Sequence, residues 1–328
     1  MRKLLEFFWF SLAISAVALV AMYFYGGVTA FVTAALLAVL EVTLSFDNAV
    51  VNARVLRKMS VVWQRRFLTW GILIAVVGTR LVLPILIVSA VVWASPWAIA
   101  EMAFLNPAEY GHLLEGARYA IHAFGAAFLI MVSLKYFLND KKEVHWIRIL
   151  ERHLASWGRV ESVEIALALI IIAGLSFLVP AAAAATVLVA GVIGVVLFIL
   201  MEGITTTFSV ESSAAASGLA LFVYLNVLDS AFSLDSVVGA FALTSALPVI
   251  VVGLGIGAYF VRSLTLYMVR EHTLDTLKYL EHGAHWAIFG LAVSMFVSLL
   301  LEVPEIVTGT IGIIFVVAAY WSSVRLRS

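Results

Sequence analysis

Long apolar stretches alternate with short polar segments along most of the chain. A helix needs roughly 20 mainly apolar residues to cross the hydrocarbon core of a bilayer, and ten stretches approach or exceed that length. They lie at residues 7–25, 28–53, 67–93, 117–138, 164–180, 183–204, 214–243, 247–269, 284–302 and 305–324. This pattern predicts an all-α, polytopic membrane protein with about ten transmembrane helices.

Lysine and arginine residues gather in alternate segments between these stretches. They precede the first predicted helix, follow the second, fourth and eighth, and end the chain, whereas the opposite loops carry mainly glutamates. Because cytoplasmic loops are enriched in Lys and Arg, ten helices place both termini in the cytoplasm of a bacterial inner membrane. A signal peptide ending at Ala18 is the alternative for the N-terminus, but the apolar stretch continues to Tyr25, which favours an uncleaved first helix.

Residues 139–163 form the longest charged segment of the chain. Trp146, Ile149 and Leu150 fall at helical spacing within it, which predicts a cytoplasmic amphipathic helix lying on the membrane; a solvated linker is the alternative. Residues 1–163 then hold helices 1–4 and this linker as the first repeat, and residues 164–328 hold the remaining helices. We expect the two parts to form one integrated transmembrane domain.

A polar motif interrupts the second apolar stretch and recurs in the seventh. The stretches "LEVTLSFDNAVVN" (40–52) and "LDSAFSLDSVVGA" (228–240) share an acidic residue, a serine, an aspartate and then Asn or Ser, at the same spacing. The alignment pairs Glu41 with Asp229, Ser45 with Ser233, Asp47 with Asp235, and Asn48 with Ser236.

Two further matches follow in the same order along the chain. Residues 71–80 resemble 253–262, which aligns Arg80 with Arg262, and residues 116–121 resemble 283–288. The chain is therefore predicted to contain two related halves of about five helices each. An odd number of helices inverts the second half in the membrane, and inverted repeats are typical of secondary transporters with a binding site near the midplane.

The composition agrees with a membrane protein and excludes several other classes. Hydrophobic residues make up 64% of the chain and charged residues 12%, with a mean hydropathy of +1.10, against about 45–50% and 25% in soluble domains. The formal net charge is zero, so no basic surface indicates nucleic-acid binding. The absence of cysteine excludes disulfides and thiolate metal sites.

Charged side chains inside predicted spans are the candidate functional residues. Each costs roughly 2.5–3.5 kcal/mol at the bilayer centre on insertion scales. The four motif carboxylates and the two aligned arginines leave a formal charge of −2, which one divalent cation or two protons would neutralise. We expect Arg80 and Arg262 to pair with carboxylates.

The residue types in the motif suit a hard cation. Carboxylate, amide and hydroxyl oxygens favour Mg²⁺, Ca²⁺ and Mn²⁺, and no histidine accompanies either copy. Glu41, Ser45 and Asn48 share one helical stripe, whereas Asp47 points about 100° away from Asn48 on a regular helix. Convergence therefore requires local unwinding, or Asp47 faces another neighbour. The candidate binding residues are Asp47, Asp235, Glu41, Asp229, Asn48, Ser236, Ser45 and Ser233; alone, the serines would be interpreted as interhelical hydrogen-bonding residues.

Three other features carry weaker signals. Glu202, beside Thr205–Thr207, is a candidate ligand through which an ion enters, although a hydrated helix end explains it as well. His282 and His285 have metal-ligand spacing, but we interpret them as part of a helix cap. The "GLGIG" at 253–257 predicts close helix packing rather than a nucleotide loop, because no strand precedes it.

At "SFDNAVV" and "SLDSVV" the sequence resembles the TerC family of bacterial membrane proteins, in particular a branch catalogued as a domain of unknown function. The resemblance implies an inverted-repeat fold of the lysine-exporter-like superfamily, in which several members look like manganese exporters. It implies that Asp47, Asn48, Asp235 and Ser236 occupy the family's motif positions, with Glu41 and Asp229 upstream; Ser236 departs from the asparagine of the first copy. The family is also tied to tellurite resistance, but an oxyanion favours basic groups, and this motif is acidic.

We therefore expect a secondary transporter, not an enzyme, that exports Mn²⁺ or another hard divalent cation such as Ca²⁺. The ion is its substrate; no cofactor is implied, and the bilayer is its other partner. One alternative is a membrane assembly or stress-resistance factor without transport, in which the carboxylates only pair with Arg80 and Arg262. Another is an intramembrane aspartyl protease, but neither Asp follows the Gly-x-Gly signature of those enzymes.

Overall fold

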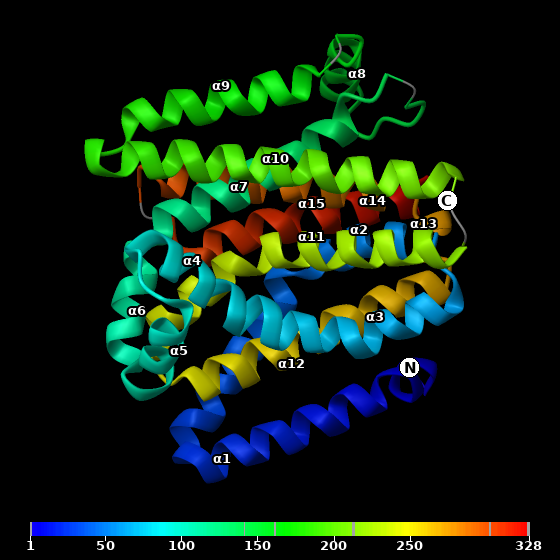
Figure 1. The fold of residues 1–328 in the computed structure, drawn as a ribbon. Helices are drawn as coiled ribbons and strands as arrows, with labels where there is room; N and C mark the ends of the chain where they lie inside the picture. The colour runs from blue at the N-terminus through cyan, green and yellow to red at the C-terminus, as the bar shows by residue number, and fades with distance from the viewer. Residues whose placement is uncertain (1, 141, 161, 212–213, 302, 327–328) are drawn as a thin grey trace. The chain divides into compact units, whose positions relative to one another are not determined.

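A computed structural model describes residues 2–140, 142–160, 162–211, 214–301 and 303–326 of the 328-residue chain, without the side chains of residues 2–6, 208–211, 214–217, 242 and 305–306. Every regular element in these ranges is helical (Figure 1). The elements are α1 (Arg2–Leu44), α2 (Phe46–Leu56), α3 (Val61–Leu73), the π-helix η1 (Ile74–Val82), α4 (Leu83–Val92), α5 (Pro96–Leu105), α6 (Pro107–Gly116), α7 (Arg118–Phe137), α8 (Arg148–Trp157), α9 (Val163–Leu178), α10 (Ala181–Glu211), α11 (Ala214–Leu243), α12 (Leu247–Arg270), α13 (Thr273–Thr276), α14 (Leu280–Ser298) and α15 (Glu305–Arg325).

Each of the ten apolar stretches is helical over most of its length. Within the described ranges, seven helical segments are long and apolar enough to cross a membrane, with α1 counted once and α3, η1 and α4 counted as one. The protein is thus all-helical, with the apolar helices of a multi-pass membrane protein. The count of ten spans remains a prediction. The cytoplasmic location of both termini also remains a prediction, and some of the basic residues near the termini are not among the described side chains.

The helices form two compact units that are interleaved along the chain. Unit 1 contains Met1–Arg118 and Leu221–Glu271, and unit 2 contains Tyr119–Ala220 and His272–Ser328. Each unit therefore combines helices from both predicted repeats. All the motif residues and both aligned arginines belong to unit 1.

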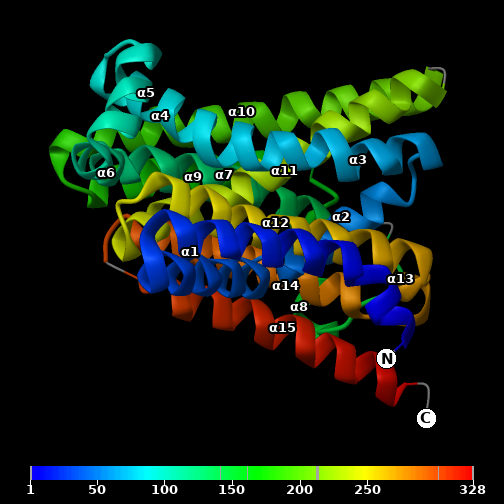
Figure 2. The same cartoon turned by 90° about the horizontal axis from the view of Figure 1, so that it is seen from below.

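In unit 1, α1 is a helical hairpin. Gly26 and Gly27 leave the helical conformation, and Gly27 has φ 68° and ψ −157°, a combination that only glycine adopts without strain. The chain reverses direction there, so that α1 has two arms, as both views show (Figures 1 and 2). The predicted first helix corresponds to the first arm, and the predicted second helix, 28–53, covers the second arm and most of α2.

The second arm of α1 packs closely along α12. A methyl group added to Gly253 would lie 2.9 Å from the carbonyl oxygen of Ala34, and one added to Gly257 would overlap the side chain of Glu41. These contacts are the helix packing that the "GLGIG" sequence predicts. Because α12 has no side chain at either position, the backbone that carries Glu41 can lie directly against it.

The predicted third helix is continuous but contains a π-helical stretch. Residues Ile74–Val82 form η1, which ends two residues before Pro84. In a regular α-helix the Pro84 ring would clash with the carbonyl of Arg80, so the wider turns are found where the α-helical ladder cannot continue. An apolar cluster around Leu56, Phe67, Leu225 and Leu266 joins α2, α3, α11 and α12.

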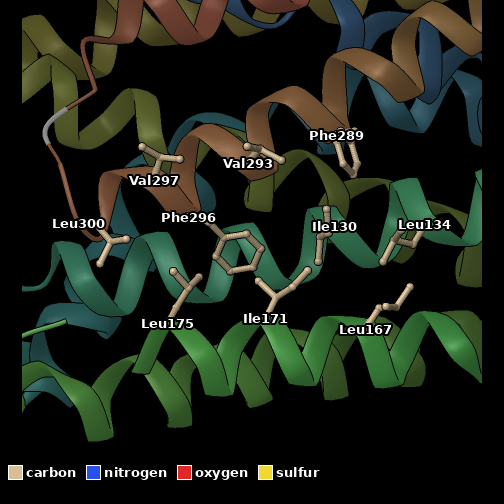
Figure 3. Close-up of a pocket in the computed structure, with 10 residues that line it drawn as sticks. All are labelled: Ile130, Leu134, Leu167, Ile171, Leu175, Phe289, Val293, Phe296, Val297 and Leu300. Atoms are coloured by element: carbon tan, nitrogen blue, oxygen red, sulfur yellow. The ribbon is translucent and has the colours of Figure 1, made fainter. Parts of the chain in front are cut away.

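In unit 2, α9 and α10 form an antiparallel pair on either side of Pro180, and α14 and α15 form another (Figure 1). An apolar pocket of about 280 Å³ lies between α7, α9 and α14 (Figure 3). Its lining consists of Ile130, Leu134, Leu167, Ile171, Leu175, Phe289, Val293, Phe296, Val297 and Leu300. None of these side chains is polar, so this pocket cannot bind an ion.

Candidate functional site

The first motif spans a break between two helices. α1 ends at Leu44, Ser45 has φ −101° and ψ 16°, and α2 begins at Phe46. The break is small, because the Ser45 amide still donates to the Glu41 carbonyl at 2.9 Å. It places Asp47 in the first turn of α2, where the unpaired amides of a helix N-terminus favour negative charge. The structure thus contains a small break at Ser45, and the convergence of the motif side chains on one ion stays a prediction.

Glu41 is 1% exposed and forms an ion pair with Arg80, which is 2% exposed. The same carboxylate oxygen, Oε1, accepts a hydrogen bond from the Ser45 hydroxyl at 3.2 Å. Arg80 also donates to the Ala75 carbonyl at 2.8 Å, within η1, and to the Ser233 hydroxyl at 3.2 Å. Four of the candidate residues are therefore joined in one hydrogen-bonded group.

The second repeat contains the equivalent pair. The Arg262 Nη2 atom lies 2.9 Å from Oδ2 of Asp229 and 3.3 Å from Oδ1 of Asn226. Arg262 Nη1 donates to the Phe67 carbonyl at 3.2 Å, and the guanidinium lies 4.3 Å from the centre of the Phe67 ring. A methyl group on Gly71 would overlap this guanidinium, so glycine leaves the space for it.

The two arginines are arranged reciprocally. Each pairs with the acidic residue of its own repeat, at the aligned positions Glu41 and Asp229, and each also donates to the other repeat. Arg80 reaches Ser233 on α11, and Arg262 reaches the backbone of α3. The ion pairs therefore connect the two copies of the motif within unit 1.

Several buried oxygens of the first motif have no hydrogen-bond partner in the described part of the chain. They are Oε2 of Glu41 and the Oδ1 atoms of Asp47, Asn48 and Asn52. The four side chains are at most 4% exposed. Buried polar atoms without a partner are rare in folded proteins, and four carboxylate and amide oxygens within twelve residues are suited to a hard cation.

The second motif differs from the first in its surroundings. Asp235 is only partly buried, and it has interactions of its own. The Ser236 hydroxyl donates to the Ser233 carbonyl at 3.0 Å, so it is engaged with its own helix. Among the residues described, no three His, Cys, Asp or Glu side chains come together as metal ligands. The structure thus does not gather the four motif carboxylates into one cluster.

Glu202 belongs to unit 2, whereas the motif residues belong to unit 1. Its carboxylate is 3.1 Å from the Lys135 amine, which is also 3.2 Å from Glu164. The hydroxyls of Thr205 and Thr206 both donate to the Glu202 carbonyl rather than to its side chain. Glu202 is therefore a partner of Lys135, a pairing that the sequence analysis did not identify.

The structure also reveals residues and roles that the sequence analysis missed. Asn52 continues the stripe of Glu41, Ser45 and Asn48 by one more turn, and that spacing could have identified it. Asn226 has no polar counterpart in the first repeat, so the alignment gave no signal for it. His282 is not a helix cap: it bonds Glu151 at 2.8 Å, while Tyr279 precedes α14 without a side-chain cap.

Comparison with known proteins adds a family but no activity. A family model described as "Protein of unknown function (DUF475)" matches residues 46–328. That range begins at the first residue of α2 and includes both aspartates of the repeated motif. No curated protein and no solved structure matches the chain.

Proposed function

The chain belongs to the DUF475 family, and we propose that it is a secondary transporter that exports a hard divalent cation, most favourably Mn²⁺, across a bacterial inner membrane. The substrate ion binds at oxygen ligands of the repeated motif, with Asp47 and Asp235 as the charged ligands. Ca²⁺ is the next candidate, since it favours the same ligand types.

The observation that carries the proposal is the environment of Asp47. Its side chain is 4% exposed, and Oδ1 has no hydrogen-bond partner within the described ranges. An isolated buried carboxylate is costly unless a cation or proton neutralises it. The nearby Asn48 and Asn52 provide further buried oxygens without partners in the described ranges, which are ligand types that a hard cation accepts.

The two buried arginines separate the acidic residues of the motif into two groups with different roles. Because Arg80 and Arg262 already neutralise Glu41 and Asp229, these acidic residues hold helices together and contribute at most a free oxygen to the ion. Asp47 and Asp235 are then the acidic residues of the motif that we assign to the divalent substrate. The small break at Ser45 resembles the interrupted helices at which transporters bind ions.

The proposed transporter has ten membrane spans in two inverted repeats. It is supported by the reciprocal ion pairs, by the two arms of α1, and by the composition of unit 1, which takes equivalent helices from both repeats. The resemblance to the TerC family supports export as the direction of transport. A role in tellurite resistance would then be a consequence of ion export and not a separate activity.

A non-transporting membrane assembly factor is the second candidate, and the buried ion pairs favour it. Pairs such as Arg80–Glu41 could serve only to join helices, which accounts for both arginines. This alternative gives no role to Asp47, which is buried and has no cationic partner among the described residues. Substitutions at Asp47 therefore distinguish the two functions.

The test is ion movement in everted membrane vesicles that carry the full chain. We would compare Mn²⁺, Ca²⁺, Mg²⁺ and Zn²⁺ in the native protein, Asp47→Asn and Asp235→Asn. Export appears as uptake into such vesicles, and we expect selective Mn²⁺ uptake that falls by at least about 10–100-fold in both variants, the range seen when metal sites lose supporting residues.

Asp275→Asn provides the matched control, since it makes the same chemical change on an exposed side chain of α13. It should transport like the native protein. If folded native protein moves none of the four ions, the transporter is excluded and the assembly factor becomes the better explanation. Uptake that persists in Asp47→Asn would remove that residue from the site.

A further inference from the structure

The helix α8 is held in one orientation by its buried glutamate. Glu151 is fully buried, and its two oxygens accept five hydrogen bonds within unit 2. The donors are Lys142 Nζ at 3.2 Å, the amides of Trp146 and Ile147 at 3.1 and 3.4 Å, His282 Nδ1 at 2.8 Å and Trp286 Nε1 at 3.0 Å. A carboxylate accepts about four, so Glu151 is saturated and α8 is fixed against the start of α14.

The opposite side of α8 carries apolar side chains that nothing in the described chain covers. Ile149 is 88% exposed, Leu150 52% and Trp157 44%. At 100° per residue these three occupy one face, and Glu151 and Ala155 occupy the buried face. A small helix that exposes large apolar side chains opposite its attachment needs an apolar environment on that side.

Arg148 and Arg152 lie one turn apart between the buried and the apolar faces. Both are exposed, and with Ile149 and Ser156 they line a shallow hollow on the surface of α8. Glu151 lies three residues after Arg148 and so within helical reach of it, but its oxygens are already saturated. In the described part of the chain neither arginine has an ion-pair partner, so this edge is positively charged.

The connections of α8 keep it beside the bilayer. Only residues 158–162 separate it from α9, so its end lies within about 20 Å of that apolar helix. At the other side, Lys135 near the end of α7 bonds Glu164 at the start of α9, which holds the ends of the two membrane helices together. With α7 and α9 as predicted spans, the membrane surface is thus the apolar environment within reach of the exposed face.

We propose that α8 docks on the bilayer surface and that its Arg148–Arg152 edge binds the phosphate groups of anionic phospholipids. Ile149, Leu150 and Trp157 insert between the acyl chains, and the arginines contact the headgroups, as amphipathic surface helices do. The Glu151 contacts transmit this docking to α14. The proposal rests on the helices and does not depend on ion transport.

The test uses the full chain, which contains no cysteine. A spin label on Ile149→Cys, and separately on Leu150→Cys, would report contact with oxygen, which concentrates in the bilayer, and with a water-soluble nickel chelate. The protein would be compared in nanodiscs of phosphatidylcholine alone and of phosphatidylcholine mixed with phosphatidylglycerol. Asp275→Cys is the control for a water-exposed position.

We expect both α8 labels to contact oxygen in the mixed nanodiscs, and the Asp275 label to contact nickel in both. Replacing Arg148 and Arg152 together with Gln should lower the ratio of inserted to exposed label by roughly fivefold for each arginine, with an unchanged thermal midpoint. Labels that contact nickel as strongly as the control in both nanodiscs would overturn the docking and leave the face to a soluble partner. Insertion that depends neither on phosphatidylglycerol nor on the arginines would overturn headgroup binding.

Discussion

Arg80 and Arg262 are buried cations whose partners are set by the repeat. In each pair both side chains are at most 7% exposed, and the arginines satisfy carboxylates that would otherwise be isolated in an apolar region. The sequence predicts that these residues pair, because they are basic residues in the interior of predicted spans, at aligned positions of the two halves. It could not predict that each arginine also bonds the other repeat, since Ser233 and the Phe67 carbonyl come within reach only through packing.

Removing one member of such a pair should cost more than removing both. Arg80→Gln leaves the Glu41 carboxylate buried without a cation, and we expect a loss of about 3–5 kcal/mol in unfolding free energy. The double variant Arg80→Gln, Glu41→Gln should recover most of that loss, because no uncompensated charge remains. Chemical unfolding in detergent micelles measures both values.

Arg65→Gln is the matched control for this change, since Arg65 is exposed on α3 and exposed substitutions stay within about 0.5 kcal/mol. If the double variant is as unstable as the sum of the single ones, Arg80 and Glu41 do not stabilise each other, and the pairing would contribute nothing to the fold.

At the level of elements, the helices were predicted and their irregularities were not. Apolar periodicity and length identify the long helices, and α11 has the predicted limits of 214–243. The π-helix η1 depends on how Pro84 and the buried Arg80 fit together, which no local pattern specifies. The short helices α5 and α6 lie in a segment predicted as a loop, and the break at Ser45 was one of two alternatives.

The attachment of α8 should depend on pH. Burial favours the neutral form of Glu151, but the hydrogen bond and charge of His282, the charge of Lys142 and the hydrogen bond of Trp286 outweigh it and lower the pKa of Glu151 from 4.5 to about 2. His145 also faces this carboxylate at 3.8 Å, and burial and then Lys142 lower its pKa. Since the pKa of Glu151 is lower in the folded protein, its ionised form stabilises the attachment above pH 4.5.

That stabilisation, about 3 kcal/mol for a shift of this size, should disappear as the pH falls from 4.5 through 2. The protection factors of the Arg148–Trp157 amides, measured relative to their intrinsic exchange rates at each pH, should therefore fall over this range. In Glu151→Gln the same amides should have low protection factors at neutral pH, and these should not change further as the pH falls. Exchange in α9 serves as the internal reference, and equal protection of α8 in the variant would contradict the role of Glu151.

At the scale of the molecule, the sequence predicts a repeat but gives no signal for the compact units. The alignment of Glu41 with Asp229 and of Arg80 with Arg262 predicts equivalent helices; the structure contains both ion pairs and places them in unit 1, while the repeat itself stays a prediction. The boundary predicted at residue 163 follows the chain, whereas the compact units exchange helices between the halves. Which helices pack together depends on side-chain fit, such as Gly257 against Glu41, and not on order in the sequence.

The number of spans decides which side of the membrane each loop faces. Dividing α1 at Gly26–Gly27 and adding α9 and α14 to the seven apolar segments gives the ten predicted spans. At 1.5 Å per residue, the 16 residues of α9 cover about 24 Å and the 19 of α14 about 28 Å, close to the hydrocarbon thickness of roughly 30 Å.

With a cytoplasmic N-terminus, ten spans leave Ser60 inside and Glu101 outside, whereas a single crossing by α1 reverses both. Because the chain has no cysteine, Ser60→Cys and Glu101→Cys can be treated with a membrane-impermeant thiol reagent in spheroplasts. We expect Glu101→Cys to react at once and Ser60→Cys only after permeabilisation. The opposite labelling would exclude the helical hairpin as two spans and, with it, the repeat of five helices in each half, because the first half would then cross the membrane only four times.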